Sequence, residues 1–328
     1  AQIHLTGQDA TSDVLMEMDG LVQFGSAQFP LANVQINTAK VVYNPKTQLT
    51  VFGNVTLQNA QFEMLSNGLF DQSNAIVVQM ADSVIVKDTR FTGFEKALNY
   101  FGTLKEKNRL NILHSQFKNC STAVEAQSVT CMAQSMVLSQ CETGLRLNQL
   151  ESDAQLQNCQ ISNCKTGVVV SEREQSGIVL QVQTCDFVKN QLGLALNQCH
   201  TAIACSRFVA NGVGVEDAFG TMTLSESYGL QGLKGLYYGG NNTFAYQQQY
   251  AIQLKATWFY LNQGKNNFMA TATAQAPYNF IVGDVAYSAE THNTSSPYAL
   301  KAADNFWQNY SSSNIDNGVY QWYLIKLP

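Results

Sequence analysis

Acidic side chains and one histidine recur at a fixed spacing, and these residues could act in acid/base catalysis or in metal binding. Counted from three glycines that open apolar runs, the seventh residue is in turn Glu151, Glu174 and His200. Further carboxylates flank these positions at Asp153, Glu172, Glu216 and Asp217. If equivalent residues of successive repeats stack, they form an acidic stripe along one loop edge.

Two kinds of chemistry would suit such a stripe. A Ca²⁺ ion takes carboxylate oxygens as ligands, and Glu151, Glu174 and Asp217 are the candidates. An acid/base pair with a raised pKa is the alternative, with candidates Glu151, Asp153, Glu172, Glu174 and Asp217. The competing interpretation is a solvated loop edge that keeps the protein soluble and prevents edge pairing, and this is the one we prefer.

A second candidate site is aromatic and lies in the C-terminal third. Exposed aromatic rings stack against sugars and anchor protein partners. They can equally cover an open end of a repeat fold, which we prefer here. The candidate ligand-binding residues are Tyr237, Tyr238, Tyr246, Tyr250, Trp258 and Tyr260.

Other reactive groups give weaker signals. His4, His114, His200 and His292 are isolated, and no nucleophile elbow or phosphate-binding loop occurs. The eight cysteines all lie between Cys120 and Cys205 at repeat positions, without zinc-site spacing. We expect a stack of free buried thiols, although disulfides remain the alternative.

A repeat positions all these residues. The clearest copies, Leu156–Val170 and Val182–Leu196, alternate apolar and polar residues around a short turn that precedes a glycine. Large apolar anchors recur every 20 to 29 residues at Phe62, Phe91, Phe117, Cys141, Ile161, Phe187, Phe208 and Tyr228. The inner period of two excludes helical repeats. The pattern predicts an all-β, right-handed parallel β-helix of about ten irregular coils.

We expect one domain over residues 1–328. Residues 1–54 would form a lead-in and early coils, residues 55–228 the regular coils, and residues 229–328 longer-looped coils and a cap. The C-terminal part would be less regular and rich in aromatic residues.

Turn motifs carry a family resemblance. Gly240-Asn-Asn-Thr-Phe244, Gly264-Lys-Asn-Asn-Phe268 and Asn305-Phe-Trp307 resemble turns of the secreted bacterial pectate-lyase-like β-helix superfamily. The resemblance implies a fold but no single activity, because members include lyases, glycosidases and adhesins. The Asn-Thr-Asp, Asp-Asp, Gly-His-Gly and Arg-Ile-Lys motifs of its polygalacturonase-type enzymes do not occur here.

Composition narrows the function. The net charge is −5, only 13% of residues are charged, and Lys and Arg are scattered, so nucleic acid is not an expected partner. No apolar run is long enough for membrane insertion.

We expect a secreted or cell-surface module with a structural or adhesive role in a larger extracellular assembly. The alternatives are a polysaccharide lyase or glycoside hydrolase at the acidic loop edge, and a non-catalytic carbohydrate-binding module. Expected partners are other surface proteins, further copies end to end, or polysaccharide. Ca²⁺ is the one cofactor that the stripe could hold.

Overall fold

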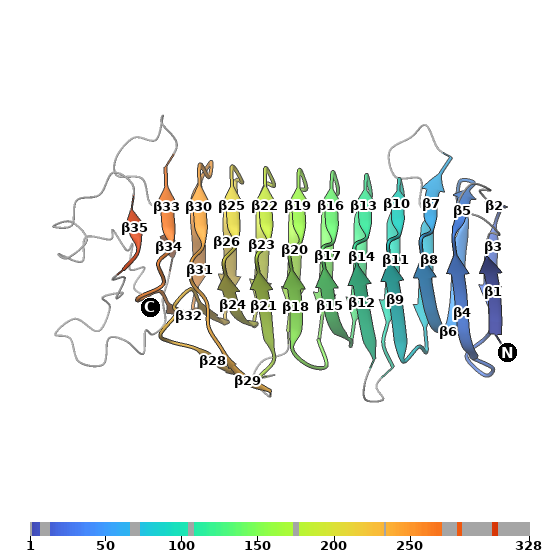
Figure 1. Ribbon diagram of the computed structural model, residues 1–328, viewed down its shortest axis with the longest axis horizontal. Coiled ribbons are helices and arrows are strands. Elements are labelled where there is room, and N and C mark those ends of the chain that lie inside the picture. Colours follow the sequence, from blue (N-terminus) through green and yellow to red (C-terminus); the bar gives the residue numbers. More distant parts are fainter. Residues whose placement is uncertain are drawn as a thin grey trace, which may run out of the picture. The chain divides into compact units, whose positions relative to one another are not determined.

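The computed structural model describes residues 2–6, 14–65, 73–103, 108–172, 177–232, 234–270, 281–283 and 304–307 (Figure 1). Within these ranges the chain consists of β-strands and their connections, without an α-helix. It follows that no described helix could cross a bilayer.

The chain divides into two compact units. The first comprises Ala1–Ser152 and Cys159–Val169, and the second comprises Asp153–Asn158 and Val170–Pro328. Strand β20 (Thr166–Ser171) spans the boundary.

The strands of the first unit are β1 (Gln2–Thr6), β2 (Val14–Met18), β3 (Leu21–Phe24), β4 (Leu31–Asn37), β5 (Ala39–Tyr43), β6 (Gln48–Gln58), β7 (Gln61–Met64), β8 (Asn74–Gln79), β9 (Ser83–Lys87), β10 (Arg90–Thr92), β11 (Lys96–Phe101), β12 (Arg109–Leu113), β13 (Gln116–Lys118), β14 (Thr122–Gln127), β15 (Thr130–Gln134), β16 (Val137–Ser139), β17 (Thr143–Asn148) and β19 (Gln160–Ser162).

The strands of the second unit are β18 (Ala154–Gln157), β21 (Val179–Gln183), β22 (Asp186–Val188), β23 (Leu192–Asn197), β24 (His200–Ala204), β25 (Arg207–Val209), β26 (Val213–Ala218), β27 (Thr221–Thr223), β28 (Leu230–Gly232), β29 (Gly235–Tyr237), β30 (Thr243–Ala245), β31 (Tyr250–Lys255), β32 (Trp258–Tyr260), β33 (Asn267–Met269), β34 (Ile281–Gly283) and β35 (Phe306–Trp307).

Each coil contributes strands to three parallel sheets, which we number in chain order within a coil. In the first unit, sheet 1 contains β3, β6, β8, β11, β14 and β17. Sheet 2 contains β1, β4, β6, β9, β12 and β15. Sheet 3 contains β2, β5, β7, β10, β13, β16 and β19, which follow one another in Figure 1.

The second unit repeats this plan. Its sheet 1 contains β23, β26, β31 and β34. Its sheet 2 contains β18, β21, β24, β27 and β32. Its sheet 3 contains β22, β25, β30, β33 and β35. The predicted parallel β-helix is therefore confirmed.

Apolar anchors of sheet 3 stack inside each unit. The rings of Phe62, Phe91 and Phe117 lie nearly parallel, with centroids 4.7 and 5.0 Å apart. In the second unit the column contains Phe187, Phe208, Phe244, Phe268 and Trp307. Parallel strands in register hold equivalent side chains about 4.8 Å apart, so like residues meet like.

Two predicted anchors are wrong. Leu138, not Cys141, pairs with both Phe117 and Ile161 in sheet 3. Phe244, not Tyr228, follows Phe208. Spacing alone does not identify these two positions. An insertion between β27 and β30 lengthens one coil, and Cys141 lies in the turn after β16, not in sheet 3.

Corners between sheets follow one rule. A residue with positive φ is followed by a buried residue that points inward, as at Asn119 and Cys120 or Gln140 and Cys141. In the second unit these buried positions hold amide ladders. Asn190 N donates to Asn211 Oδ1 over 2.9 Å, and Asn211 N donates to Gln247 Oε1 over 2.9 Å. The side-chain oxygens of one coil therefore accept from backbone N–H groups of the preceding coil.

All eight cysteines are free, and all except Cys205 are buried. Cys120, Cys141 and Cys164 occupy the same corner of three coils, and each thiol donates to the carbonyl oxygen two residues before it, over 3.3 to 3.4 Å. Burial raises the pKa of Cys131 to about 12, so this thiol is unreactive. The prediction of stacked free thiols is confirmed, but Cys205 is itself a positive-φ turn residue and is exposed.

Replacing Phe91 by Ala should destabilise the first unit by about 3–5 kcal/mol, because the cavity lies between two stacked rings. Chemical denaturation monitored by circular dichroism measures the loss. Phe29, whose side chain is 76% exposed, provides the control, and its replacement by Ala should change stability little. Equal effects of the two substitutions would contradict the proposed column.

Candidate functional site

The carboxylates of the predicted acidic stripe have separate roles in the structure. In the first unit, Glu151 accepts hydrogen bonds from Asn108, at 3.2 Å from its backbone N and 2.8 Å from Nδ2. These bonds fix the chain where it enters β12. Glu174 lies outside the described residues.

In the second unit, Asp153 fastens an inserted hairpin. Its Oδ1 accepts from Val179 N over 2.9 Å, and its Oδ2 accepts from the Tyr237 hydroxyl over 2.5 Å. The hydrogen bond to Asp153 is the largest cause that raises the pKa of Tyr237, to about 12. Asp153 and Tyr237 therefore both have a structural role in holding the hairpin.

Glu172 and Asp217 are buried and do not lie on an open loop edge. Glu172 is 6% exposed, and its negative charge, like that of Asp217, raises the pKa of the Cys199 thiol, for which burial is the larger cause. The prediction placed both acids on a solvated or ligand-binding edge. Among the described residues no group of three His, Cys, Asp or Glu side chains could hold a metal ion.

Asp217 lies in an apolar column of sheet 1. Its register neighbours are Leu196 and Leu254, its exposure is 0%, and neither carboxyl oxygen has a hydrogen-bond partner. Burial raises its pKa to about 8, and the nearby amide of Ala218 offsets part of this shift. Asp217 is therefore mostly a neutral acid at pH 7.

Gly220 makes room for this carboxyl group. A Cβ at Gly220 would lie 2.7 Å from Asp217 Oδ1 and 2.3 Å from the Cys199 carbonyl oxygen. The sequence showed Asp217 beside Glu216 but not which of the two points inward. Alternation along β26 decides this, because Glu216 is exposed and Asp217 is not.

The aromatic candidates divide between packing and exposure. Strands β28 and β29 form an antiparallel hairpin on the outer face of sheet 2, where Leu230 packs with Val179 and Ala202. Tyr237 and Tyr260 pack against this cluster, and Tyr260 stacks on Tyr228 with ring centroids 5.9 Å apart. These rings hold the hairpin in place.

The remaining aromatic candidates do not form one platform. Trp258 belongs to sheet 2, Tyr250 to sheet 1, and Tyr246 to the corner that follows sheet 3. Trp258, Tyr238 and Tyr246 are 39%, 44% and 46% exposed. The structure brings only Tyr237 and Tyr260 together around the hairpin.

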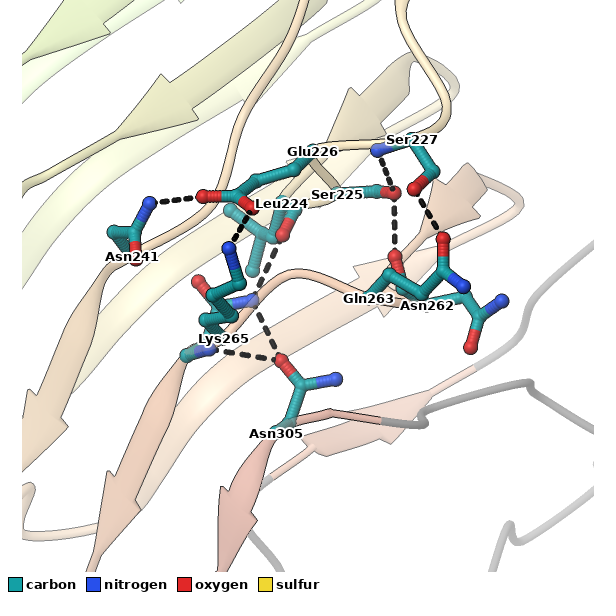
Figure 2. Close-up of polar contacts among 10 residues, drawn as sticks. Leu224, Ser225, Glu226, Ser227, Asn241, Asn262, Gln263, Lys265 and Asn305 are labelled. Atoms are coloured by element: carbon teal, nitrogen blue, oxygen red, sulfur yellow. Dashed lines mark hydrogen bonds and ion pairs between the residues drawn. The ribbon is translucent and has the colours of Figure 1, made fainter.

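Polar contacts fix the base of the hairpin insertion (Figure 2). Glu226 accepts hydrogen bonds from Asn241 Nδ2 and from Lys265 Nζ, the latter at 2.6 Å. The Ser225 hydroxyl donates to the Asn262 carbonyl over 2.5 Å. The pKa of Glu226 is lowered, above all by the hydrogen bond from Lys265. The insertion is thus held at its base and at its far end.

A cluster that the sequence interpretation missed lies on the outer face of sheet 1 in the first unit. This outer-face cluster consists of Lys96, Asn99 and Phe101 on β11, Glu125 on β14 and Arg146 on β17. Asn99, Glu125 and Arg146 are consecutive register partners. Lys96 Nζ lies 2.6 Å from Glu125 Oε2, and Arg146 Nη2 donates to Thr143 Oγ1 over 3.5 Å.

A sequence signal for this cluster exists. Asn99, Glu125 and Arg146 each lie two residues after the small residue at the second position of their strand, Ala97, Ala123 or Gly144. Counting seven residues from Gly144 and from the equivalent Gly193 leads to Glu151 and His200 instead. Both offsets are regular, but only the shorter one stays within the strand from which it is counted, whereas Glu151 lies between β17 and β18 and His200 begins β24.

Comparison with known proteins identifies the fold. A family model described as "Right handed beta helix region" matches residues 39–208, more than half of the chain. Among solved structures, the periplasmic alginate epimerase AlgG is similar with 9% sequence identity and a TM-score of 0.41, covering 86% of this chain and 68% of that chain. No curated protein sequence matches the chain.

Replacing Asp217 by Leu or Asn should stabilise the protein in a pH-dependent way. The folded-state pKa lies above the unfolded value, so ionisation of the carboxyl group costs no stability below about pH 4 and progressively more up to about pH 8. The cost rises by roughly 1.4 kcal/mol per pH unit in this range and then levels off. Denaturant titrations of the two variants and the wild type at pH 5, 7 and 9 measure it. A gain in stability that is the same at all three pH values would refute the burial of an unpaired Asp217.

Replacing Tyr237 by Phe should loosen the hairpin, because the bond to Asp153 is lost while the ring remains. Hydrogen exchange followed by mass spectrometry should show faster exchange in residues 229–238 and no change in β25. The matched control is Tyr238→Phe, which removes an exposed hydroxyl. If the two variants exchange alike, the Asp153 bond does not hold the hairpin.

Proposed function

The chain belongs to the right-handed β-helix family, and on this premise we propose that it is a non-catalytic β-helix module with a structural and adhesive role. Its place would be outside the cell, secreted or on the cell surface, within a larger assembly. Its partners would be other surface molecules.

This proposal rests on one observation: the candidate carboxylates make structural contacts or are buried in the core. Glu151 binds Asn108, Asp153 binds Val179 and Tyr237, and Asp217 lies inside the apolar core. A pair of catalytic acids needs carboxyl groups that face one substrate from either side of its bond. Glu151 and Asp153 instead hold a strand and a hairpin in place, as a scaffold requires, and Asp217 is buried away from any substrate.

A second candidate is a lyase or hydrolase acting on polysaccharide. One observation favours it: the outer-face cluster places the Glu125 carboxylate next to Lys96 and in register with Arg146. Cationic side chains beside a carboxylate can hold an acidic sugar and move a proton. The test of the proposed function therefore includes this cluster.

The test is a turnover screen of the full chain against acidic and neutral polysaccharides, with and without Ca²⁺. We expect no release of reducing ends or unsaturated products. Product formation that disappears in Glu174→Gln would establish an acidic active site, whereas its disappearance in Glu125→Gln would place catalysis at the outer-face cluster. Asp153→Asn serves as a variant in a structural carboxylate and should alter stability alone.

A further inference from the structure

Three cysteines of the first unit, Cys120, Cys141 and Cys164, form a thiol row at one corner of the β-helix. Each lies three residues after an anchor of sheet 3, and the three anchors are consecutive register partners. Backbone bonds continue this register through the corner. Glu142 N donates to the Cys120 carbonyl oxygen over 3.1 Å, and Lys165 N donates to that of Cys141 over 3.0 Å. Neighbouring cysteines are therefore one coil apart.

The three side chains also have the same orientation. Each thiol donates to the carbonyl oxygen two residues before it, over 3.4 Å in Cys120, 3.3 Å in Cys141 and 3.4 Å in Cys164. Side chains that make the same contact in successive coils repeat at the coil spacing, so neighbouring sulfur atoms are about 4.8 Å apart. In agreement with this proximity, the Cys141 thiol is the largest cause that lowers the pKa of Cys120.

The fold does not require a thiol at this corner. The preceding coil has Phe94 in the equivalent position, and coils of the second unit have Asn190 and Asn211, all of them buried. The amide of Asn211 accepts a hydrogen bond from a backbone N–H group, whereas the thiols are weak donors to carbonyl groups. Packing alone therefore does not explain three cysteines in succession.

The arrangement in a row restricts the ions that these thiols can bind. Structural zinc sites place four ligands around one point, and the described part of the chain has no group of three His, Cys, Asp or Glu side chains that could hold a metal ion. Neighbouring thiols of the row form pairs instead. An ion held in line between two sulfur atoms needs them about 4.6 Å apart, if each metal–sulfur bond is about 2.3 Å long as in zinc sites. This separation is close to the coil spacing.

A soft monovalent ion with two ligands in a line suits such a pair. Thiolate ligands select Cu(I) over harder cations. When the ion binds, each of two S–H bonds is replaced by a Cu–S bond, two protons are released, and copper stays in the +1 state. The row is buried but lies directly beneath the surface, because exposed turn residues such as Asn119 and Gln140 precede its cysteines.

We propose that the thiol row binds a Cu(I) ion, which Cys141 holds together with Cys120 or Cys164. Cys141 is the essential ligand because it belongs to both pairs. Cys120 and Cys164 are two coils apart, about 9.6 Å, so they do not share an ion. The inference is independent of the proposed function, which concerns the carboxylates and the outer surface.

The experiment titrates the reduced full chain with Cu(I) under anaerobic conditions. The ion is supplied as its bicinchoninate complex, so that the protein competes for it. A second set of samples is refolded in the presence of the complex, because the row is buried in the folded chain. We expect the protein to withdraw Cu(I) from the complex, with a rise in melting temperature that grows with the free Cu(I) concentration.

The middle cysteine is compared with the two flanking ones. Cys141→Ala should weaken binding about a hundredfold or more, because changes behind a ligand already cost about 10–100-fold in metal affinity. Cys120→Ala and Cys164→Ala each keep one pair and should bind nearly as tightly as the wild type, whereas the double variant Cys120→Ala/Cys164→Ala should not. All these variants remove the same side chain from the same corner.

Cys199→Ala provides the control for a single buried thiol. Cys199 is 0% exposed, and the equivalent corner residue of the next coil is Gly220, so it has no cysteine beside it there. This variant should bind Cu(I) at the thiol row as the wild type does.

Adventitious binding to individual thiols would reduce binding equally in Cys120→Ala, Cys141→Ala and Cys164→Ala, and this result would overturn the inference. Failure to compete with bicinchoninate in both the folded and the refolded samples would overturn it as well. If Cys141→Ala does not fold, the double variant decides the question against the two single flanking variants. None of these outcomes bears on the turnover screen, so the proposed function is tested separately.

Discussion

The structure depends on one constraint, the in-register pairing of parallel coils. Each residue of a strand lies about 4.8 Å from its equivalents in the coils before and after it. A side chain is therefore stable where its neighbours can stack with it, as Phe91 does between Phe62 and Phe117. The same rule places amides on amides and thiols on thiols at the corners. Buried polar groups can then satisfy one another, and the core does not have to be wholly apolar.

The requirement for in-register pairing is weaker at the corners between the sheets. Sheet residues have partners on both sides, but a corner needs only one residue of positive φ and one that turns inward. Chain can be inserted there without disturbing the register, as between β27 and β30, where Phe208 still pairs with Phe244. The inserted hairpin needs its own stabilisation, and this explains why Asp153 and Glu226 are occupied in holding it. Acidic residues near corners are thus poor indicators of catalysis in this fold.

The sequence predicts the fold because stacking repeats a residue type at a fixed distance. Phe62, Phe91, Phe117, Phe187 and Phe208 are all true anchors for that reason. The predictions of individual anchors and site residues failed where they depended on one residue and not on a repeated residue type. Cys141 imitated an anchor from a corner, and Asp217 looked like a partner of Glu216 although alternation along β26 turns it inward. The outer-face cluster escaped notice because Lys96, Glu125 and Arg146 are far apart in sequence and only the register unites them.

Asp217 and Asn99 show why the face of a strand matters more than the residue type. Each lacks hydrogen-bond partners for carbonyl or carboxyl oxygens, and each has an apolar register neighbour, Leu196 or Val77. Asp217 points into the core, where no ligand can reach it, so its group adjusts by staying protonated. Asn99 cannot change its charge, and it points to the face that carries Lys96, Glu125 and Arg146. The same shortage of hydrogen bonds is thus relieved by protonation at Asp217 and stays unrelieved at Asn99.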